Sequence, residues 1–319
     1  MGAMRLVYAI PLHNRFRGIT VREGVLLRGP AGWGEFCPFA DYSDAESSPW
    51  LASAVEASEV GWPAPVRDRV EVNTTVPVVS PERAHELVVA SGCRTAKVKV
   101  ADPRSSLVDD CDRVAAVRSA LGRGGAIRVD ANMAWDVDTA VKSIRELDRA
   151  AGGLEYVEQP CPSIEDLAAV RRQVGVRIAA DESIRRAEDP LKVAVAGAAD
   201  VAVIKVAPLG GVRRALEVAE ACGLPCVVSS AVETSVGLAA GLALAGALPS
   251  LEFACGLGTR SLLTGDVTSA ELSPADGYLP VPRTAPEPDL AENVAAPADV
   301  RDHWLARLER VEASRRMSS

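Results

Sequence analysis

The hydrophobic positions of this chain form short apolar runs that alternate with longer amphipathic stretches. From about residue 70 onward, each run rich in Val, Ile and Ala is followed by a segment such as 102–121 or 137–151, in which apolar residues recur at helical spacing among charged ones. A short continuous apolar run is typical of a strand buried on both faces, and a period of 3.6 residues is typical of an amphipathic helix. The pattern predicts eight strands, at about 70–76, 94–100, 126–130, 154–158, 177–181, 201–205, 225–229 and 251–255.

This regular alternation predicts an α/β fold with a parallel sheet. Right-handed crossovers would close eight such strands into a TIM-like (β/α)8 barrel. A barrel of this kind takes roughly 250 residues, so that a modest part of the 319 residues remains for an accessory unit.

The residues before the alternation have a different pattern. Segments 4–12, 19–29 and 31–36 are separated by Gly and Pro and predict three antiparallel strands, and a helical pattern follows at 43–60. The Pro-containing stretch 61–68 predicts a linker.

Three parts of the chain follow from these patterns. We expect an N-terminal α+β capping domain over 1–68, a barrel catalytic domain over 69–260, and a C-terminal segment over 261–319 that packs on the cap. The last part ends in an amphipathic helical pattern at 299–316.

Composition restricts the class of partner. The hydrophobic fraction of 48% allows a large core, and the net charge of -8 disfavours nucleic acid and anionic membranes. The first residues lack the pattern of a secretory signal, and no apolar run reaches membrane-spanning length. We therefore expect a cytoplasmic enzyme for a small-molecule substrate; the oligomeric state follows from none of these patterns.

The seven cysteines form an odd set without a CxxC pair. This usage predicts reduced thiols with packing roles. A redox-linked pair of Cys222 and Cys226 is the alternative, although no histidine of a zinc site accompanies them.

Three acids lie at the ends of successive predicted strands. Asp130, Glu158 and Asp181 end the third, fourth and fifth strands, and all strands of a parallel barrel end at the same face. Three neighbouring carboxylates need a cation, and all-oxygen ligation favours Mg²⁺, with Mn²⁺ as a substitute. The alternative is that they cap helices or lie in solvated turns.

Three lysines flank these acids. Lys97 and Lys99 lie two residues apart, so both side chains point to one face of an extended strand, and Lys205 ends the sixth strand, opposite the second in a ring of eight. A carboxylate held at the acids would place its α-carbon between the lysines, which predicts proton abstraction through an enediolate. The alternative is an edge strand with solvated lysines, which the flanking Val98 and Val100 argue against.

Other polar residues near the strand ends are weaker candidates. Residues after the seventh and eighth strands could bind substrate, and Arg15 and Arg17 in a predicted cap loop could close over an anionic substrate. Residues beside the acids could support them by hydrogen bonds. The alternatives are helix caps and solvated loops. The predicted substrate-binding residues are Ser229, Ser230, Glu233, Gly256 and Arg15, and the predicted supporting residues are Asn132, Gln159 and Glu182.

With these residues in place, the chain resembles the enolase superfamily, in which a Lys or His base acts beside Mg²⁺. The KVK motif at 97–99 with Lys205 is similar to the muconate lactonizing subgroup, and no histidine lies at a predicted strand end. Further segments are similar to o-succinylbenzoate synthases of the actinobacterial kind: PLHNRFRGITVREGVLL, GWGEFCPF, SSAVETSVGLAAGLALAGALP and SLLTGD.

The resemblance implies roles for the lysines. Lys99 would remove the α-proton and return it to the leaving hydroxyl in a syn dehydration, Lys205 would stabilise the enediolate by its charge, and Lys97 would help to position the carboxylate. The implied cofactor is Mg²⁺, and the implied product is 2-succinylbenzoate, on the route to menaquinone. The sequence ACGLGT at 254–259 lacks the paired aspartates of dipeptide epimerases, which disfavours a dipeptide substrate.

Three alternative functions stay open. Racemisation of N-succinylamino acids needs the same two opposed lysines. A metal-free aldolase could use Lys205 as a Schiff base, but it would leave the three carboxylates without a purpose. A non-catalytic binding barrel would have no reason to keep the lysines and acids together.

Overall fold

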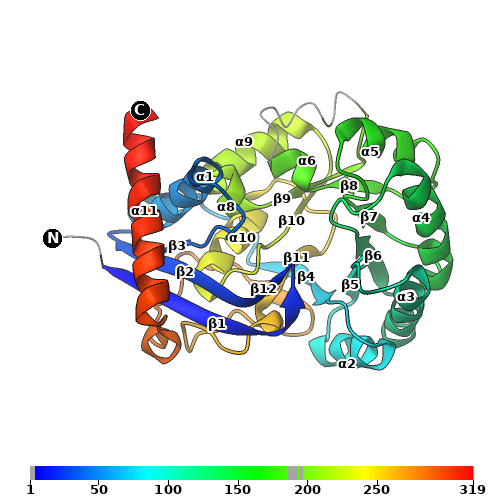
Figure 1. The fold of residues 1–319 in the computed structure, drawn as a ribbon, viewed down its shortest axis with the longest axis horizontal. Helices are drawn as coiled ribbons and strands as arrows, with labels where there is room; N and C mark the ends of the chain where they lie inside the picture. The colour runs from blue at the N-terminus through cyan, green and yellow to red at the C-terminus, as the bar shows by residue number, and fades with distance from the viewer. Residues whose placement is uncertain (1–3, 186–192, 194–196, 319) are drawn as a thin grey trace.

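A computed structural model describes residues 4–185, 193 and 197–318. It consists of a small antiparallel sheet with adjoining helices and a ring of parallel strands surrounded by helices (Figure 1). The predicted fold class, a (β/α)8-type barrel with an α+β cap, is confirmed.

The cap is built on three antiparallel strands in the order β1-β2-β3. β1 (Arg5–Phe16), β2 (Ile19–Gly29) and β3 (Gly32–Phe36) correspond to the three predicted strands. Helix α1 (Asp44–Val55) follows and continues into a π-helical segment, η1 (Glu56–Val60), where the sequence pattern predicted one uniform helix.

Helix α1 begins where the sequence provides a capping box. The Ser43 side chain accepts from the backbone of Glu46, and the Glu46 side chain accepts from the backbone of Ser43. Trp50 and Leu51 on this helix are buried against the cap sheet, so the helix covers part of one of its two apolar faces, at β2 and β3.

Within the described residues, eight parallel strands form the ring. Their order is β10-β9-β8-β7-β6-β5-β4-β11, and an isolated parallel bridge between Ser229 and Gly256 joins the two ends. The strands are β4 (Arg69–Val76), β5 (Thr95–Lys99), β6 (Ala126–Asp130), β7 (Tyr156–Glu158), β8 (Ile178–Ala180), β9 (Val201–Ile204), β10 (Cys226–Val228) and β11 (Cys255–Gly258).

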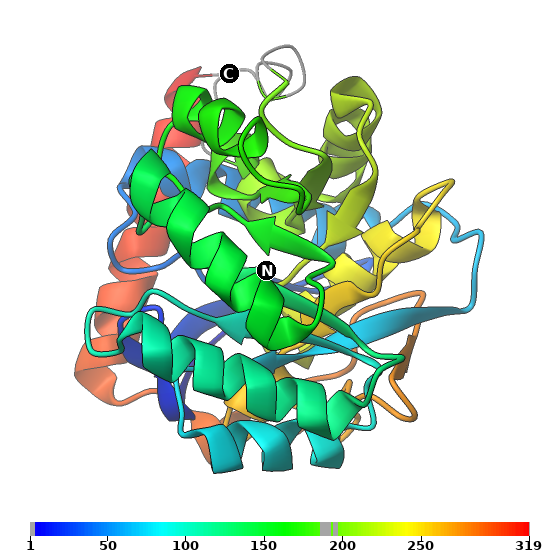
Figure 2. The same ribbon diagram turned by 90° about the vertical axis from the view of Figure 1, so that its right-hand side faces the viewer.

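Helices cover the outside of this ring, and Figure 2 shows those of residues 81–151 side by side along one flank. They are α2 (Pro81–Ser91), α3 (Leu107–Leu121), α4 (Val137–Ala151), α5 (Ile164–Arg171), α9 (Val212–Cys222) and α10 (Ser235–Ala247). Two short helices, α6 (Glu182–Arg185) and α8 (Val206–Leu209), follow the carboxyl ends of β8 and β9, and α8 contacts the cap helix α1. None of the helices described is both long and apolar enough to cross a membrane.

Seven of the eight predicted barrel strands match the observed ones, and the prediction for the eighth was wrong. The strand lies at Cys255–Gly258, not at 251–255. Its two glycines make it a poor strand by propensity. Both are required by close contacts, since a Cβ on Gly256 would lie 2.6 Å from Ser229 Oγ and one on Gly258 would lie 2.4 Å from the Asn73 carbonyl oxygen.

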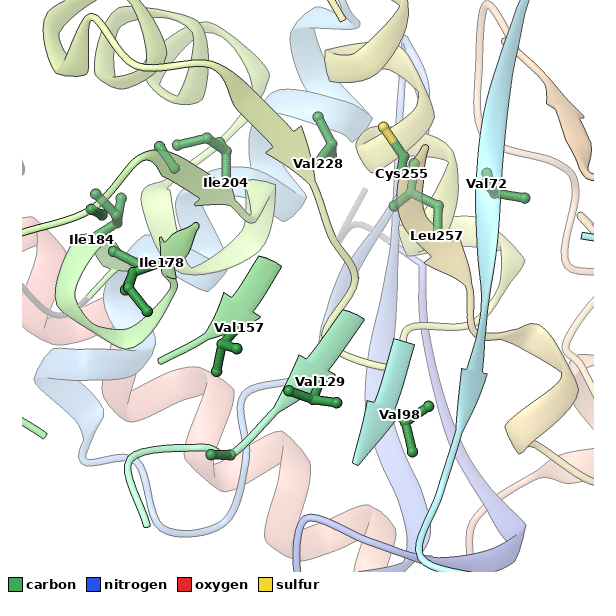
Figure 3. Packing of buried hydrophobic residues seen from close by; sticks show 14 of the residues in the cluster. Val72, Val98, Val129, Val157, Ile178, Ile184, Ile204, Val228, Cys255 and Leu257 are labelled. Atoms are coloured by element: carbon green, nitrogen blue, oxygen red, sulfur yellow. The ribbon is translucent and has the colours of Figure 1, made fainter. Parts of the chain in front are cut away.

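The main core lies between the ring and its helices. Side chains such as Val98, Val129 and Val157 come from successive strands and pack with buried apolar residues of the surrounding helices (Figure 3). Residues one position away along the same strands, such as Lys97 and Arg128, lie inside the ring. The alternation along each strand therefore separates this core from the inside of the ring, which also holds a smaller apolar cluster that includes Tyr156, Val203 and Val227.

The residues after the barrel divide between the two parts. β12 (Tyr278–Pro280) pairs antiparallel with β4 of the ring, while helix α11 (Ala298–Ser318) lies across the cap strands (Figure 1). Trp304, Leu308 and Val311 form the buried stripe of α11. Short 3-10 turns η2 (Arg260–Leu262) and η3 (Ala291–Val294) connect these pieces.

Candidate active site

The carboxyl ends of the strands bring the predicted acids into adjacent positions. Asp130 and Glu158 are direct neighbours in the parallel register of β6 and β7, and Asp181 immediately follows β8. Their exposed fractions are 1%, 0% and 1%. Three carboxylates are thus buried at one end of the ring, where isolated negative charges are unfavourable.

The predicted lysines lie against these acids. Lys99 Nζ is 2.5 Å from Asp130 Oδ2, and Lys205 Nζ is 2.6 Å from Asp181 Oδ2. Lys97 Nζ lies 3.0 Å from both oxygens of Glu158 and 3.7 Å from Asp130. Each acid is therefore balanced by at least one ammonium group.

The electrostatics of the cluster show how closely these charges interact. Burial is the largest influence on the pKa of Glu158 and raises it; Asp130 and Asp181 add to this effect, and Lys97 opposes it. Burial also acts to lower the pKa of Lys97, but Glu158 and Asp130 outweigh it and hold that pKa above its usual range. The carboxylates raise one another's proton affinity, so they would gain from a further cation.

The donor set fits a hard divalent cation in its chemistry, since it consists of carboxylate oxygens from adjacent strands. Among the residues that the structure describes, however, no three His, Cys, Asp or Glu side chains already stand where they could hold a metal ion together. The Lys97 ammonium lies close to two of the three acids. A bound cation would require this ammonium or the carboxylates to shift.

Lys97, Lys99 and Lys205 line one cavity of about 30 Å³. Lys99 comes from β5 and Lys205 follows β9, and these two strands are four places apart in the ring of eight, on opposite sides. The structure thus brings the three predicted lysines to one cavity. An anionic group in this cavity would have an ammonium on each flank.

The residues predicted to support the acids make the expected kinds of contact. Asn132 Oδ1 accepts from Lys99 Nζ at 2.7 Å, and Asn132 Nδ2 donates to Glu182 Oε1 at 3.5 Å. Gln159 bridges two strand ends, because its Oε1 accepts from the Asp181 amide at 2.9 Å. Asn132 and Gln159 have φ values of 45° and 40°, a left-handed backbone that is common at functional sites.

The residues predicted to bind substrate divide into two groups. Ser229, Ser230 and Gly256 line the catalytic cavity with the lysines. Glu233 lines a neighbouring internal cavity instead, where its carboxylate accepts from Ser230 Oγ at 2.5 Å and shapes the turn. Arg15 does not line the catalytic cavity but an adjoining open hollow of about 490 Å³, which Lys99 and Asn132 line as well.

Comparison with known proteins agrees with this arrangement. The family description "Enolase C-terminal domain-like" matches residues 80–286, and "Enolase N-terminal domain-like" matches residues 7–58. The chain is 62% identical over 308 residues to the o-succinylbenzoate synthase of Thermobifida fusca (strain YX), covering 96% of this chain and 95% of that protein. The chain belongs to the o-succinylbenzoate synthase family. The o-succinylbenzoate synthase of Mycolicibacterium smegmatis is 53% identical over 303 residues, 95% of this chain and 93% of its own length.

Solved structures of other proteins share the fold of this o-succinylbenzoate synthase family member. The L-Ala-D/L-Glu epimerase of Bacillus subtilis superposes with a TM-score of 0.75 at 25% identity, over 90% of this chain and 97% of the epimerase. The muconate lactonizing enzyme of Pseudomonas fluorescens superposes with a TM-score of 0.77 at 21% identity, over 92% and 98%. The second likeness shows the fold alone.

The sequence indicated Arg17, beside Arg15, as a cap-loop arginine that could close over an anionic substrate, but it did not single out Phe16 or Phe39 as residues of the catalytic cavity. Phe16, Arg17 and Phe39 line it together with the lysines. Arg17 and Gly18, with φ values of 47° and 82°, form the tight turn between β1 and β2. The sequence RFRG suggested a loop, but nothing local to it indicated which side of the barrel the loop covers.

Proposed function

We propose that this chain catalyses the Mg²⁺-dependent syn dehydration of 2-succinyl-6-hydroxy-2,4-cyclohexadiene-1-carboxylate to 2-succinylbenzoate, in menaquinone biosynthesis. The observation that carries the proposal is the placement of Lys99 and Lys205 on opposite sides of one cavity, each beside a buried carboxylate. Its seven cysteines all lie in the described residues, and none forms a disulfide there, which suits the reducing cytoplasm as the place of action.

Lys99 is proposed as the base. In its neutral form, Nζ takes the proton from the carbon next to the substrate carboxylate, and the electron pair of that C–H bond moves into an enediolate. The same Nζ then gives the proton to the departing hydroxide as the C–O bond breaks, so that water leaves. Asp130 and Asn132 orient this side chain, because both accept hydrogen bonds from Lys99 Nζ.

Lys205 is proposed to stay protonated on the opposite side of the substrate. Its charge stabilises the second negative charge of the enediolate, which exists only after the proton has left. Asp181, at 2.6 Å, keeps the ammonium in place.

Asp130, Glu158 and Asp181 are the proposed holders of the metal. Mg²⁺, with Mn²⁺ as a substitute, would supply Lewis-acid stabilisation to the substrate carboxylate when bound there. Lys97 donates hydrogen bonds to Glu158 and to Ser229 Oγ. It is proposed to position the substrate carboxylate in the cavity.

The test follows loss of the diene absorbance when purified protein meets the substrate and Mg²⁺. We expect turnover by the wild type and a fall in kcat of at least about a thousandfold for Lys99→Ala, because the proton would lack an acceptor. The matched control is Lys142→Ala, a lysine on α4 outside the cavity, which should keep full activity. Absence of turnover by wild-type protein that binds Mg²⁺ would reject dehydration of this substrate.

The same two lysines favour a second candidate, racemisation of N-succinylamino acids, since one could remove the α-proton and the other return it. Deuterium exchange at the α-carbon of each enantiomer tests it. Racemisation predicts fast exchange in wild type and loss of exchange for one enantiomer in Lys205→Arg. Equal exchange of both enantiomers by the variant would exclude this role for Lys205.

A further inference from the structure

We propose that Arg307, on the C-terminal helix α11, is a positioning residue for the catalytic cavity. It holds segment 37–42 so that Phe39 keeps Arg17 at the cavity wall, where Arg17 binds the second carboxylate of a dicarboxylate substrate. This inference rests on the proposed function and deepens it, since it names what selects the substrate at the end away from the lysines.

Arg307 is buried, with an exposed fraction of 4%, and its guanidinium points into the cap. It donates to the carbonyl oxygens of Phe39 at 3.0 Å and Tyr42 at 2.7 Å, to that of Pro38 at 3.4 Å, and to Ser47 Oγ at 3.0 Å. These carbonyls belong to a connection between β3 and α1 that has no regular secondary structure. The Phe39 carbonyl also accepts from the Tyr42 amide at 3.1 Å, and the guanidinium supplies further donors to acceptors that no helix or sheet pairs. One guanidinium therefore fixes the path of this segment at several points.

A second buried arginine holds the start of the same segment. Arg22, on β2, is 2% exposed and donates to the carbonyl oxygens of Cys37 at 2.5 Å and Val232 at 3.0 Å. Val232 has a φ of 63°, which is strained for a β-branched residue. Arg22 thereby ties segment 37–42 to the turn that carries the cavity-lining Ser230.

Phe39 is the part of this segment that reaches the cavity. It is 5% exposed and meets Tyr42 and Trp50 edge to face, at centroid distances of 6.1 and 6.0 Å. The guanidinium carbons of Arg17 and Arg22 lie 4.3 and 4.6 Å from its centroid. The ring is thus a fixed platform on which Arg17 rests.

Arg17 is placed to bind an anion. It lines the catalytic cavity from the cap side, and it also lines the larger hollow that opens to solvent. A contact with an aromatic face restrains a guanidinium but does not use its N–H donors, which bind carboxylates in pairs. With one substrate carboxylate beside Lys97 and Lys99, a second one at Arg17 would account for cationic groups on both sides of the cavity.

The first experiment compares Arg307→Met and Arg307→Lys with Arg310→Met in steady-state kinetics on the dicarboxylate substrate. Arg310 lies on the same helix, has a 54% exposed side chain and pairs with Asp44, so it is the matched control. For Arg307→Met we expect KM to rise about tenfold, which is the size expected for the loss of one charge-assisted contact. The kcat should change less than about threefold. Arg307→Lys should recover part of the loss, and Arg310→Met should behave as wild type.

A double variant tests the route through Arg17. If Arg307 acts by holding Arg17, Arg17→Met should raise KM at least as much, and adding Arg307→Met should raise it no further. Independent, multiplying effects would overturn the proposal, as would a fall in kcat with KM unchanged. Should Arg307→Met fail to fold, Phe39→Leu removes the platform instead, and the same non-additivity with Arg17→Met is required.

A binding measurement separates this inference from the proposed reaction. Calorimetry would compare 2-succinylbenzoate with 2-butanoylbenzoate, which lacks the distal carboxylate. We expect Arg307→Met and Arg17→Met to weaken binding of the first about tenfold and to leave the second unchanged. If wild type shows this Arg17-dependent preference but no turnover, the reaction is rejected and the inference stands; if wild type binds both ligands equally, the inference is rejected whatever the turnover.

Discussion

The two ends of the ring meet at Ser229 and Gly256. Their contact leaves no room for a larger residue at position 256. A Cβ on Gly256 would lie 2.6 Å from Ser229 Oγ and 3.2 Å from Ser229 Cβ. We predict that Gly256→Ala lowers the free energy of unfolding by about 1–3 kcal/mol, the usual range for overpacking, and lowers kcat/KM because Ser229 lines the catalytic cavity. Thermal unfolding and steady-state kinetics would measure the two effects.

The matched control for this substitution is Gly124→Ala. A Cβ there would meet no atom within 4 Å, so stability and activity should stay close to wild type. Equal behaviour of the two variants would contradict the account of Gly256.

At the scale of single residues, the sequence predicted which side chains converge but not which ones surround them. Lys97, Lys99 and Lys205 were expected at one cavity because strand ends have a fixed side and period, and they line it. The contacts of Arg307 with Phe39 join residues 268 positions apart. No local pattern encodes such a contact, because it depends on how α11 packs on the cap.

At the scale of elements, Glu35 on β3 connects the cap to the start of α10. Its carboxylate accepts from Tyr8, from the backbone and hydroxyl of Thr234, and from the backbone of Gly237. Burial is the largest cause that raises the pKa of Glu35; the Thr234 and Tyr8 hydrogen bonds oppose it, and Glu233 adds to it. The folded protein therefore holds this proton more tightly than the unfolded chain.

A pH prediction follows for Glu35→Gln. A raised pKa in the folded state contributes stability below the unfolded pKa of about 4.3, and this contribution is lost as pH rises through the folded value. The Tm of wild type should therefore fall relative to the Tm of Glu35→Gln as the pH rises above about 4. Calorimetry on both proteins across this range measures it, with the exposed Glu86→Gln as control; a constant difference for Glu35→Gln would refute the linkage.

Element boundaries were predictable where the sequence is locally consistent. Seven barrel strands matched because each combines a Val-rich or Ala-rich run with flanking turn residues. The eighth was misplaced because Cys255–Gly258 obeys tertiary contacts rather than strand propensity. The π-helical end of α1 was likewise beyond a pattern that only distinguishes helix from strand.

At the scale of the whole molecule, the proposed metal should stabilise the fold as well as support turnover. A ligand that binds only the folded state, at about a hundred times its Kd, adds about 2.7 kcal/mol to the free energy of unfolding. We predict that Mg²⁺ raises Tm, that a chelator reverses the rise and stops turnover, and that Asp181→Asn greatly reduces the Mg²⁺ effect. Calorimetric unfolding with and without Mg²⁺ tests this.

The control for this measurement is Asp200→Asn. Asp200 pairs with Arg171 just before β9, away from the carboxyl ends of the strands. Its variant should keep the full response to Mg²⁺. If Asp181→Asn kept the same response as Asp200→Asn, Asp181 would not be a metal ligand.

The single bridge between Ser229 and Gly256 also gives the ring unequal resistance to opening. Every other neighbouring pair in the described ring shares a ladder of at least two residue pairs, whereas β10 and β11 meet only at this bridge. Local opening is favoured where few contacts hold neighbouring elements together. The barrel thus has a seam beside its catalytic cavity, and the first fluctuation that widens the ring would loosen the wall of the cavity before it reaches the acids on β6 and β7.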